Sequence, residues 1–278
     1  MRAVDGLKRT DPDEKKPTPM TIARITNAGE IVYTSQTGTD EDLWKLTDVK
    51  GRRKGEPLVS DQYFARESVA SPDSTYVVFA SDRTGKPHIF RVDIDESNLK
   101  QLTFGESSDS APDISPDGKW IIYRASENDK NRIWKMPSCG GLAVEFINEE
   151  SVSPAFPPDG KHVSYVSPPD GQATLGRLTV VSAEDGSIEH SFEGMNFEFY
   201  YVTPRWTPDG KSLIYRRTDT IIGNLWKRDL AGGPPTQFTD FTSQRLAYST
   251  FTRDLENLII SRGCVLLNVV MLKIIKIP

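Results

Sequence analysis

The sequence contains few of the residues that metal and redox sites require. Its 278 residues include two cysteines and three histidines. Cys139 and Cys264 lie far apart without metal-ligand spacing, so we expect neither a zinc site nor a disulfide. The histidines, His88, His162 and His190, share no local motif, and the first two fall in predicted strands. We therefore predict no metal site and no cofactor.

The sequence motifs of several common enzymes are also missing. We find no Gly-x-Ser-x-Gly nucleophile elbow, no glycine-rich phosphate loop, no dinucleotide fingerprint and no kinase His-Arg-Asp or Asp-Phe-Gly. The two glycine pairs, Gly140-Gly141 and Gly232-Gly233, fall where hairpin turns are expected. We predict that this chain is not an enzyme.

Charge and hydrophobicity argue against two further classes of protein. A net charge of −5 disfavours nucleic-acid binding, which needs a basic surface. Residues 1–19 lack the apolar core of a signal peptide. The apolar run over 264–278 is short and contains Asn268, Lys273 and Lys276, which favours a buried strand over a membrane span. We expect a monomer without a nucleic-acid partner or membrane span.

A short turn motif recurs through the chain and is its main signal. Copies read SPDS, SPDGK, PPDGK and TPDGK, with degenerate forms TNAGE and TRDLE. They are anchored at positions 28, 73, 117, 159, 209 and 254. Their spacing of roughly 42–50 residues is the period of a four-stranded propeller blade.

The residue types of the motif are those of a tight hairpin turn. Proline presets φ, the aspartate carboxylate accepts a backbone N–H two residues on, and glycine takes a positive φ. This chemistry accounts for the aspartates without a catalytic role, since each copy belongs to a separate blade. The predicted structural turn anchors are Asp73, Asp117, Gly118, Asp159, Gly160, Asp209, Gly210 and Asp254.

Strand signals keep the same register after each anchor. Short β-branched or aromatic runs come first, such as residues 76–79 and 120–123, and a second strand with an aromatic residue follows. We predict an all-β, six-bladed propeller of four-stranded antiparallel blades over residues 21–278. Residues 1–20, rich in proline and charge, are predicted to be a disordered linker.

The repeats resemble a known family. SPDGKWIIY, TPDGKSLIY, NRIWKMPSCGG and NLWKRDLAGG are similar to TolB-type, WD-like propeller repeats. The stretch 232–243 and Ser261-Arg262-Gly263 resemble the C-terminal propeller of bacterial transmembrane serine/threonine protein kinases. The likeness runs from about residue 25 to residue 263. It implies a sensor region, although neither the kinase domain nor the membrane helix is in this sequence, and the apolar tail departs from the family pattern.

The candidate binding site is the face of the ring opposite the anchor turns, which we call the anchor-distal face. Aromatic residues among carboxylates on its loops suit a protein, peptide or glycan partner. The alternative is that half of these rings simply pack between blades. The predicted partner-binding residues are Tyr63, Phe64, Arg66, Phe197, Phe199, Tyr200 and Tyr201.

Three functions remain open from the sequence. The first is a non-catalytic binding or sensor domain of a kinase-like receptor, periplasmic or extracytoplasmic as part of a larger protein. The second is a stand-alone TolB-like periplasmic propeller that docks an envelope protein. The third is a propeller enzyme of the lyase or lactonase type, which would need calcium or iron ligands in the channel. A chain that stands alone without a signal would be cytoplasmic.

Overall fold

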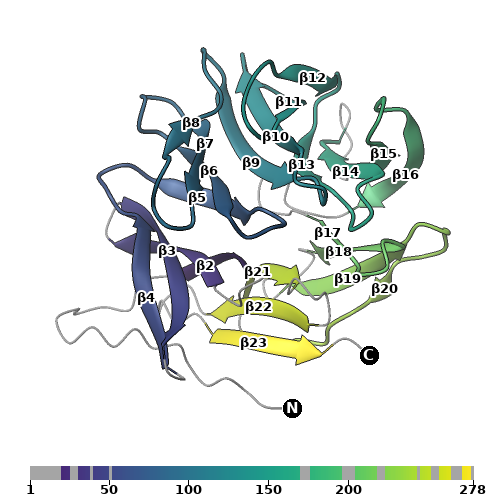
Figure 1. Ribbon diagram of the computed structural model, residues 1–278. Helices are drawn as coiled ribbons and strands as arrows, with labels where there is room; N and C mark the ends of the chain where they lie inside the picture. The colour runs from purple at the N-terminus through teal and green to yellow at the C-terminus, as the bar shows by residue number, and fades with distance from the viewer. Residues whose placement is uncertain are drawn as a thin grey trace.

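A computed structural model describes most of the chain. The described residues are 20–25, 31–37, 40–49, 52–169, 176–195, 204–217, 223–242, 245–251, 257–263 and 271–276. Their regular elements are strands, which form separate sheets arranged in a ring (Figure 1). Within this part of the chain, no helix has the length and apolar character that crossing a membrane requires.

Consecutive strands form each sheet. The first sheet contains β1 (Met20–Ile25), β2 (Ile31–Thr37), β3 (Asp40–Val49) and β4 (Arg52–Val59). The second contains β5 (Ala65–Ala70), β6 (Tyr76–Ser81), β7 (His88–Asp93) and β8 (Lys100–Gln101). The third contains β9 (Ser108–Ile114), β10 (Trp120–Glu127), β11 (Lys130–Pro137) and β12 (Val144–Ile147).

The other half of the chain repeats this order. The fourth sheet contains β13 (Val152–Ala155), β14 (His162–Ser167), β15 (Gly176–Ser182) and β16 (Ile188–Met195). The fifth contains β17 (Arg205–Trp206), β18 (Ser212–Arg217), β19 (Asn224–Asp229) and β20 (Thr236–Gln237). The last contains β21 (Arg245–Phe251), β22 (Asn257–Gly263) and β23 (Met271–Lys276).

The predicted all-β propeller with four-stranded antiparallel blades is confirmed. The finer count of six such blades is not met, because the last sheet has three strands among the described residues. Its third strand, β23, comes from the apolar C-terminal run and pairs with β22. The first strand, β1, contacts β21, so the first and last sheets are neighbours. Residue 20, assigned to the linker from the sequence, is the first residue of β1.

The core lies between neighbouring blades, and β10 shows why. Side chains of a strand point alternately to its two faces. Ile121 and Tyr123 therefore pack with Val78 of the second blade. Ile122 packs on the opposite side with Val163 of the fourth blade. Each fully buried side chain of this size contributes about 1.5–3 kcal/mol, so a blade is stabilised chiefly by its neighbours.

The anchor turns have the hydrogen bonds that their residue types predict. Asp73 accepts the backbone N–H of Thr75 at 3.1 Å and the hydroxyl of Ser71 at 2.6 Å. Asp117, Asp159 and Asp209 accept the N–H two residues on in the same way. Hydrogen bonds from the Ser or Thr hydroxyl two residues earlier hold the pKa of three of these carboxyls, at positions 73, 117 and 209, below the ordinary value.

Two details complete these turns. Gly118, Gly160 and Gly210 have φ of 73°, 68° and 66°, a conformation that glycine adopts without strain. The second blade has Ser74 at this place, with φ of 63°. Asp254, the anchor of the last repeat, lies outside the described residues.

The innermost strands carry a recurring irregularity that the sequence did not indicate. Glu67, Ala111 and Ser153 each lie six residues before an anchor position and have φ of 52°, 49° and 55°. Each lies where the register of its strand pair shifts, as at a β-bulge. None of the three is glycine, so the second, third and fourth blades each hold a residue in the left-handed region at a cost in stability.

Ala111 offers a test of that cost. Replacing Ala111 with glycine should raise the free energy of unfolding by about 0.5–1 kcal/mol, because relief of the left-handed strain exceeds the entropy that glycine adds to the unfolded chain. Ala111→Val should lower it, since a β-branched side chain is strained further there. Urea denaturation followed by circular dichroism measures both.

Ala125 is the matched control, because it lies on β10 in the same blade without a positive φ. Ala125→Gly should lower the free energy of unfolding by about 1 kcal/mol. Equal losses from the glycine variants at positions 111 and 125 would show that the bulge stores no strain.

Candidate functional site

The anchor-distal face is hollowed at the boundary between the second and third blades. A cavity of about 310 Å³ opens there. Its lining comes from the start of β5, the start of β9 and the β10–β11 hairpin. The lining residues are Phe64, Arg66, Glu67, Ala80, Pro87, Ser108, Ser110, Arg124, Ser126, Asp129 and Asn131.

Phe64 and Arg66 form one wall of this cavity. The Arg66 guanidinium lies over the Phe64 ring, 3.8 Å from its centroid, and its Nε is 3.0 Å from the Glu41 carboxylate. The Phe64 backbone N–H donates to Asp82 at 3.1 Å, which fixes the loop before β5. Stacking and the ion pair hold the guanidinium in place while its side chain stays 45% exposed.

The opposite wall is built from the third blade. Arg124 donates to the Ser110 hydroxyl from Nε at 2.9 Å and from Nη2 at 2.6 Å. The Glu67 carboxylate crosses between the blades and accepts the Ala111 N–H at 2.6 Å. The two bonds to Ser110 orient the Arg124 guanidinium without neutralising it, because the acceptor is a hydroxyl. Arg124 and Arg66 thus line the same cavity from two blades.

The structure brings together part of the predicted site. Phe64 and Arg66 line the cavity, whereas their neighbour Tyr63 does not. The Tyr63 hydroxyl instead accepts from Gln62 at 2.9 Å on the surface. The predicted aromatic cluster Phe197, Phe199, Tyr200 and Tyr201 lies outside the described residues. Binding by these residues stays a prediction.

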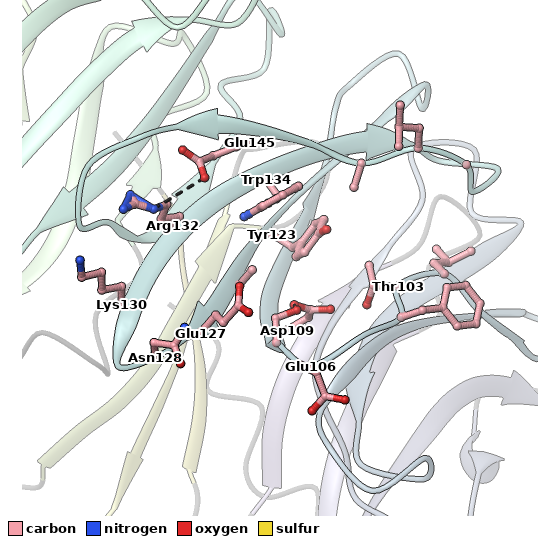
Figure 2. A pocket seen from close by; sticks show the side chains of 17 residues that line it. Thr103, Glu106, Asp109, Tyr123, Glu127, Asn128, Lys130, Arg132, Trp134 and Glu145 are labelled. Atoms are coloured by element: carbon pink, nitrogen blue, oxygen red, sulfur yellow. Dashed lines mark hydrogen bonds and ion pairs between the residues drawn. The ribbon is translucent and has the colours of Figure 1, made fainter.

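A larger groove of about 570 Å³ lies on the other side of β9 (Figure 2). From Ser107, just before β9, to Ser110, successive side chains point to opposite sides of the chain and so line different hollows. Ser107 and Asp109 line the groove, and Ser108 and Ser110 line the smaller cavity. The groove follows one face of the third blade, where Tyr123 and other residues of β10 and β11 form its floor. The sequence did not predict this groove.

A buried polar pair fixes the start of β9 beside the groove. Asp109 is 1% exposed, and its Oδ2 lies 3.1 Å from Nδ1 of His88, itself 4% exposed. Ser107 donates to the other carboxylate oxygen at 2.8 Å. These partners satisfy a carboxylate that would be costly to bury alone. His88 is a strand residue, as expected from the repeat, but its contact with the next blade could not be read from the sequence.

The other two histidines make surface contacts in the fourth blade. His162 Nε2 lies 2.9 Å from Glu189, and the His190 ring stacks on Phe192. Within the described ranges, no cluster of three or more His, Cys, Asp or Glu side chains has a geometry that would hold a metal ion.

Comparison with known proteins agrees with this architecture. A family model for the TolB β-propeller domain, PD40, matches residues 26–198. The chain belongs to the TolB β-propeller family. An uncharacterized protein of Agrobacterium fabrum is 30% identical over 158 residues, which is 53% of this chain and 53% of that protein. The Tol-Pal system protein TolB of Francisella tularensis subsp. tularensis is 27% identical over 178 residues, 61% of this chain and 39% of that protein.

This TolB-family chain matches about half, or less, of the length of these curated relatives. Among solved structures, an oligogalacturonate lyase in complex with manganese superposes with a TM-score of 0.63. It is 12% identical, and the match covers 93% of this chain and 91% of that one. At that identity the likeness shows the fold alone. The predicted resemblance to TolB is thus confirmed, whereas the closer resemblance to kinase receptors stays a prediction.

Proposed function

We propose that this chain is a non-catalytic binding propeller that captures a protein partner on its anchor-distal face. The observation that carries the proposal is the 310 Å³ cavity, where Phe64, Arg66 and Arg124 converge from two blades. Aromatic and arginine side chains provide most of the binding energy at many protein interfaces. Because Arg66 is already held by its ring and ion-pair contacts, binding would cost little further side-chain entropy.

Two features extend this proposal beyond the described contacts. We propose that the three-stranded last sheet completes a ring of six blades, since β21 contacts β1. The aromatic cluster over residues 197–201 is known here only from the sequence, and we propose that it contributes to the same face. A partner that spans several blades would then contact both regions.

We propose an envelope protein as the partner. The Francisella relative is named for the Tol-Pal system, so we propose a periplasmic chain that docks a component of such a system. The alternative, a sensor region of a kinase-like receptor, would use the same face. A lyase or lactonase function remains the third possibility, supported by shared fold only.

Purified Pal protein provides the direct test. We expect it to bind the chain in calorimetry, and Arg66→Glu to weaken binding at least tenfold, a loss of about 1.4 kcal/mol. Lys119→Glu is the control, because it reverses a charge on an anchor turn of the opposite face. An absence of binding by the folded chain would overturn the Tol-Pal assignment. Equal losses from both variants would place the interface elsewhere.

A further inference from the structure

We propose that the hairpin formed by β3 and β4, at the outer edge of the first sheet (Figure 1), binds the surface of a membrane that contains anionic lipids. Its end, residues 47–54, is called the basic tip below. The β1–β2 and β3–β4 connections lie at the same end of this antiparallel blade, so the basic tip is on the face that carries the anchor turns. The partner site proposed above is on the opposite face. The inference therefore goes beyond the proposed function, and each can fail without the other.

The β3–β4 hairpin extends further than the equivalent end of any other described sheet. In the second to fifth sheets the third strand ends opposite the first residue of the second strand, as Asp93 does opposite Tyr76. The last sheet does the same, with Lys276 opposite Asn257. β3 instead continues past Leu46, the partner of the first residue of β2, for three residues that are paired with β4. At about 3.4 Å per residue, the basic tip extends about 10 Å beyond β2.

The basic tip concentrates positive charge in a chain whose net charge is −5. The single carboxylate, Asp48, lies opposite Arg53 in the strand pair, whereas the cations at positions 52 and 54 lie opposite uncharged residues. In the second to fifth blades, the connections between the third and fourth strands contain neither lysine nor arginine. Those connections are residues 94–99, 138–143, 183–187 and 230–235, and the cations of the basic tip are Lys50, Arg52, Arg53 and Lys54.

The distribution of charge on this face favours a membrane over a nucleic acid. Asp95 and Glu184 are exposed on the equivalent connections of the second and fourth blades. A nucleic acid lying across the face would meet these carboxylates, although its binding requires several phosphates to be neutralised. A flat bilayer would meet the extended tip first. The extension of about 10 Å is similar to the Debye length at physiological salt, so the acidic remainder of the chain would be largely screened from the lipid charges.

The number of cations sets the strength of the contact. Four is the lower end of the range typical of basic segments that bind anionic lipids, and each cation near the surface strengthens binding about fivefold. We therefore expect reversible binding that depends on salt. Attachment through the face of the anchor turns would leave the anchor-distal face open to a protein partner, so the chain could hold that partner close to a membrane.

Vesicle sedimentation with the full chain tests the proposal. Vesicles of equal parts phosphatidylcholine and phosphatidylglycerol should bind the chain, and pure phosphatidylcholine vesicles should not. Salt at about 1 M, where the Debye length is about 3 Å, should release it. Arg52→Ser should weaken binding about fivefold, and Arg52→Ser, Arg53→Ser and Lys54→Ser together about a hundredfold. Arg52→Lys with Arg53→Lys should keep binding within about twofold, because a lipid surface responds to charge more than to guanidinium geometry.

The matched control removes the same charge from the same face of the ring. Lys119→Ser, Lys161→Ser and Lys211→Ser together act on exposed residues of three anchor turns, each two residues after an aspartate. This variant should bind the anionic vesicles as the unmodified chain does, and circular dichroism checks that both triple variants are folded. An absence of binding to anionic vesicles, or equal losses from the two triple variants, would overturn the proposal.

Two further outcomes would also overturn it by assigning the basic tip to another ligand. Release of the chain from vesicles by inorganic phosphate at constant ionic strength would indicate a site for a single phosphate group instead of a bilayer surface. Tighter binding to a fluorescein-labelled DNA duplex than to the anionic vesicles would indicate a nucleic-acid site.

Discussion

Replacing Trp206 with alanine should lower the free energy of unfolding by about 3–5 kcal/mol, the range typical of a buried aromatic truncated in a core. Trp206 is 5% exposed and packs with residues of the fourth and fifth blades, including Val166 and Leu213. Its Nε1 donates to the Ala155 carbonyl in the fourth blade at 3.2 Å. The variant would thus lose packing and a hydrogen bond at one boundary. Urea denaturation followed by circular dichroism measures the change.

Two further variants separate the contributions at this position. Trp206→Phe keeps a ring but loses the N–H donor, so we expect a smaller loss of about 1–2 kcal/mol. Trp120→Ala removes a tryptophan that is 39% exposed, and its loss should be smaller than that of Trp206→Ala. If the alanine variants at 206 and 120 lost the same stability, burial between blades would not be what makes Trp206 important.

The anchor turns could be predicted because their chemistry is local. The carboxylate of Asp73 and its N–H partner are two residues apart, so the bond depends on little outside the motif. The repeat spacing then gave the blade order, since each copy begins one antiparallel unit. The bulge at Ala111 could not be predicted, because its amide partner, Glu67, comes from the previous blade. An alanine carries no sequence signal for a positive φ.

Only one wall of the cavity could be predicted from the sequence, again because its residues are close together in the chain. Phe64 and Arg66 were found because both belong to one loop that leads into β5. Arg124 lies late in β10 and has the sequence environment of an ordinary strand residue. The larger groove was missed because residues that line it, such as Phe104 and Leu142, come from different blades, and sequence spacing does not tell how two blades meet.

Hydrogen bonds across the blade boundaries also hold neighbouring sheets together. Glu67 in the second blade accepts a backbone N–H of the third, and Asp113 in the third accepts one of the fourth. Both are carboxylate-to-amide bonds that start from an innermost strand. They differ in burial, since Glu67 is exposed and Asp113 is 3% exposed. The buried bond should matter more, because its loss leaves polar groups without water.

Asp113→Ala should therefore lower the free energy of unfolding by about 2–4 kcal/mol. The Asp113 carboxylate accepts the Phe156 N–H at 2.8 Å, and truncation would leave that amide without its acceptor at a partly buried boundary. Asp113→Asn keeps an acceptor oxygen in nearly the same place and should lose about 1 kcal/mol. Glu67→Ala, the exposed counterpart, should lose about 0.5–1 kcal/mol because water can replace its carboxylate. Urea denaturation compares all three, and a loss from Glu67→Ala as large as that from Asp113→Ala would show that burial does not set the strength of these interblade bonds.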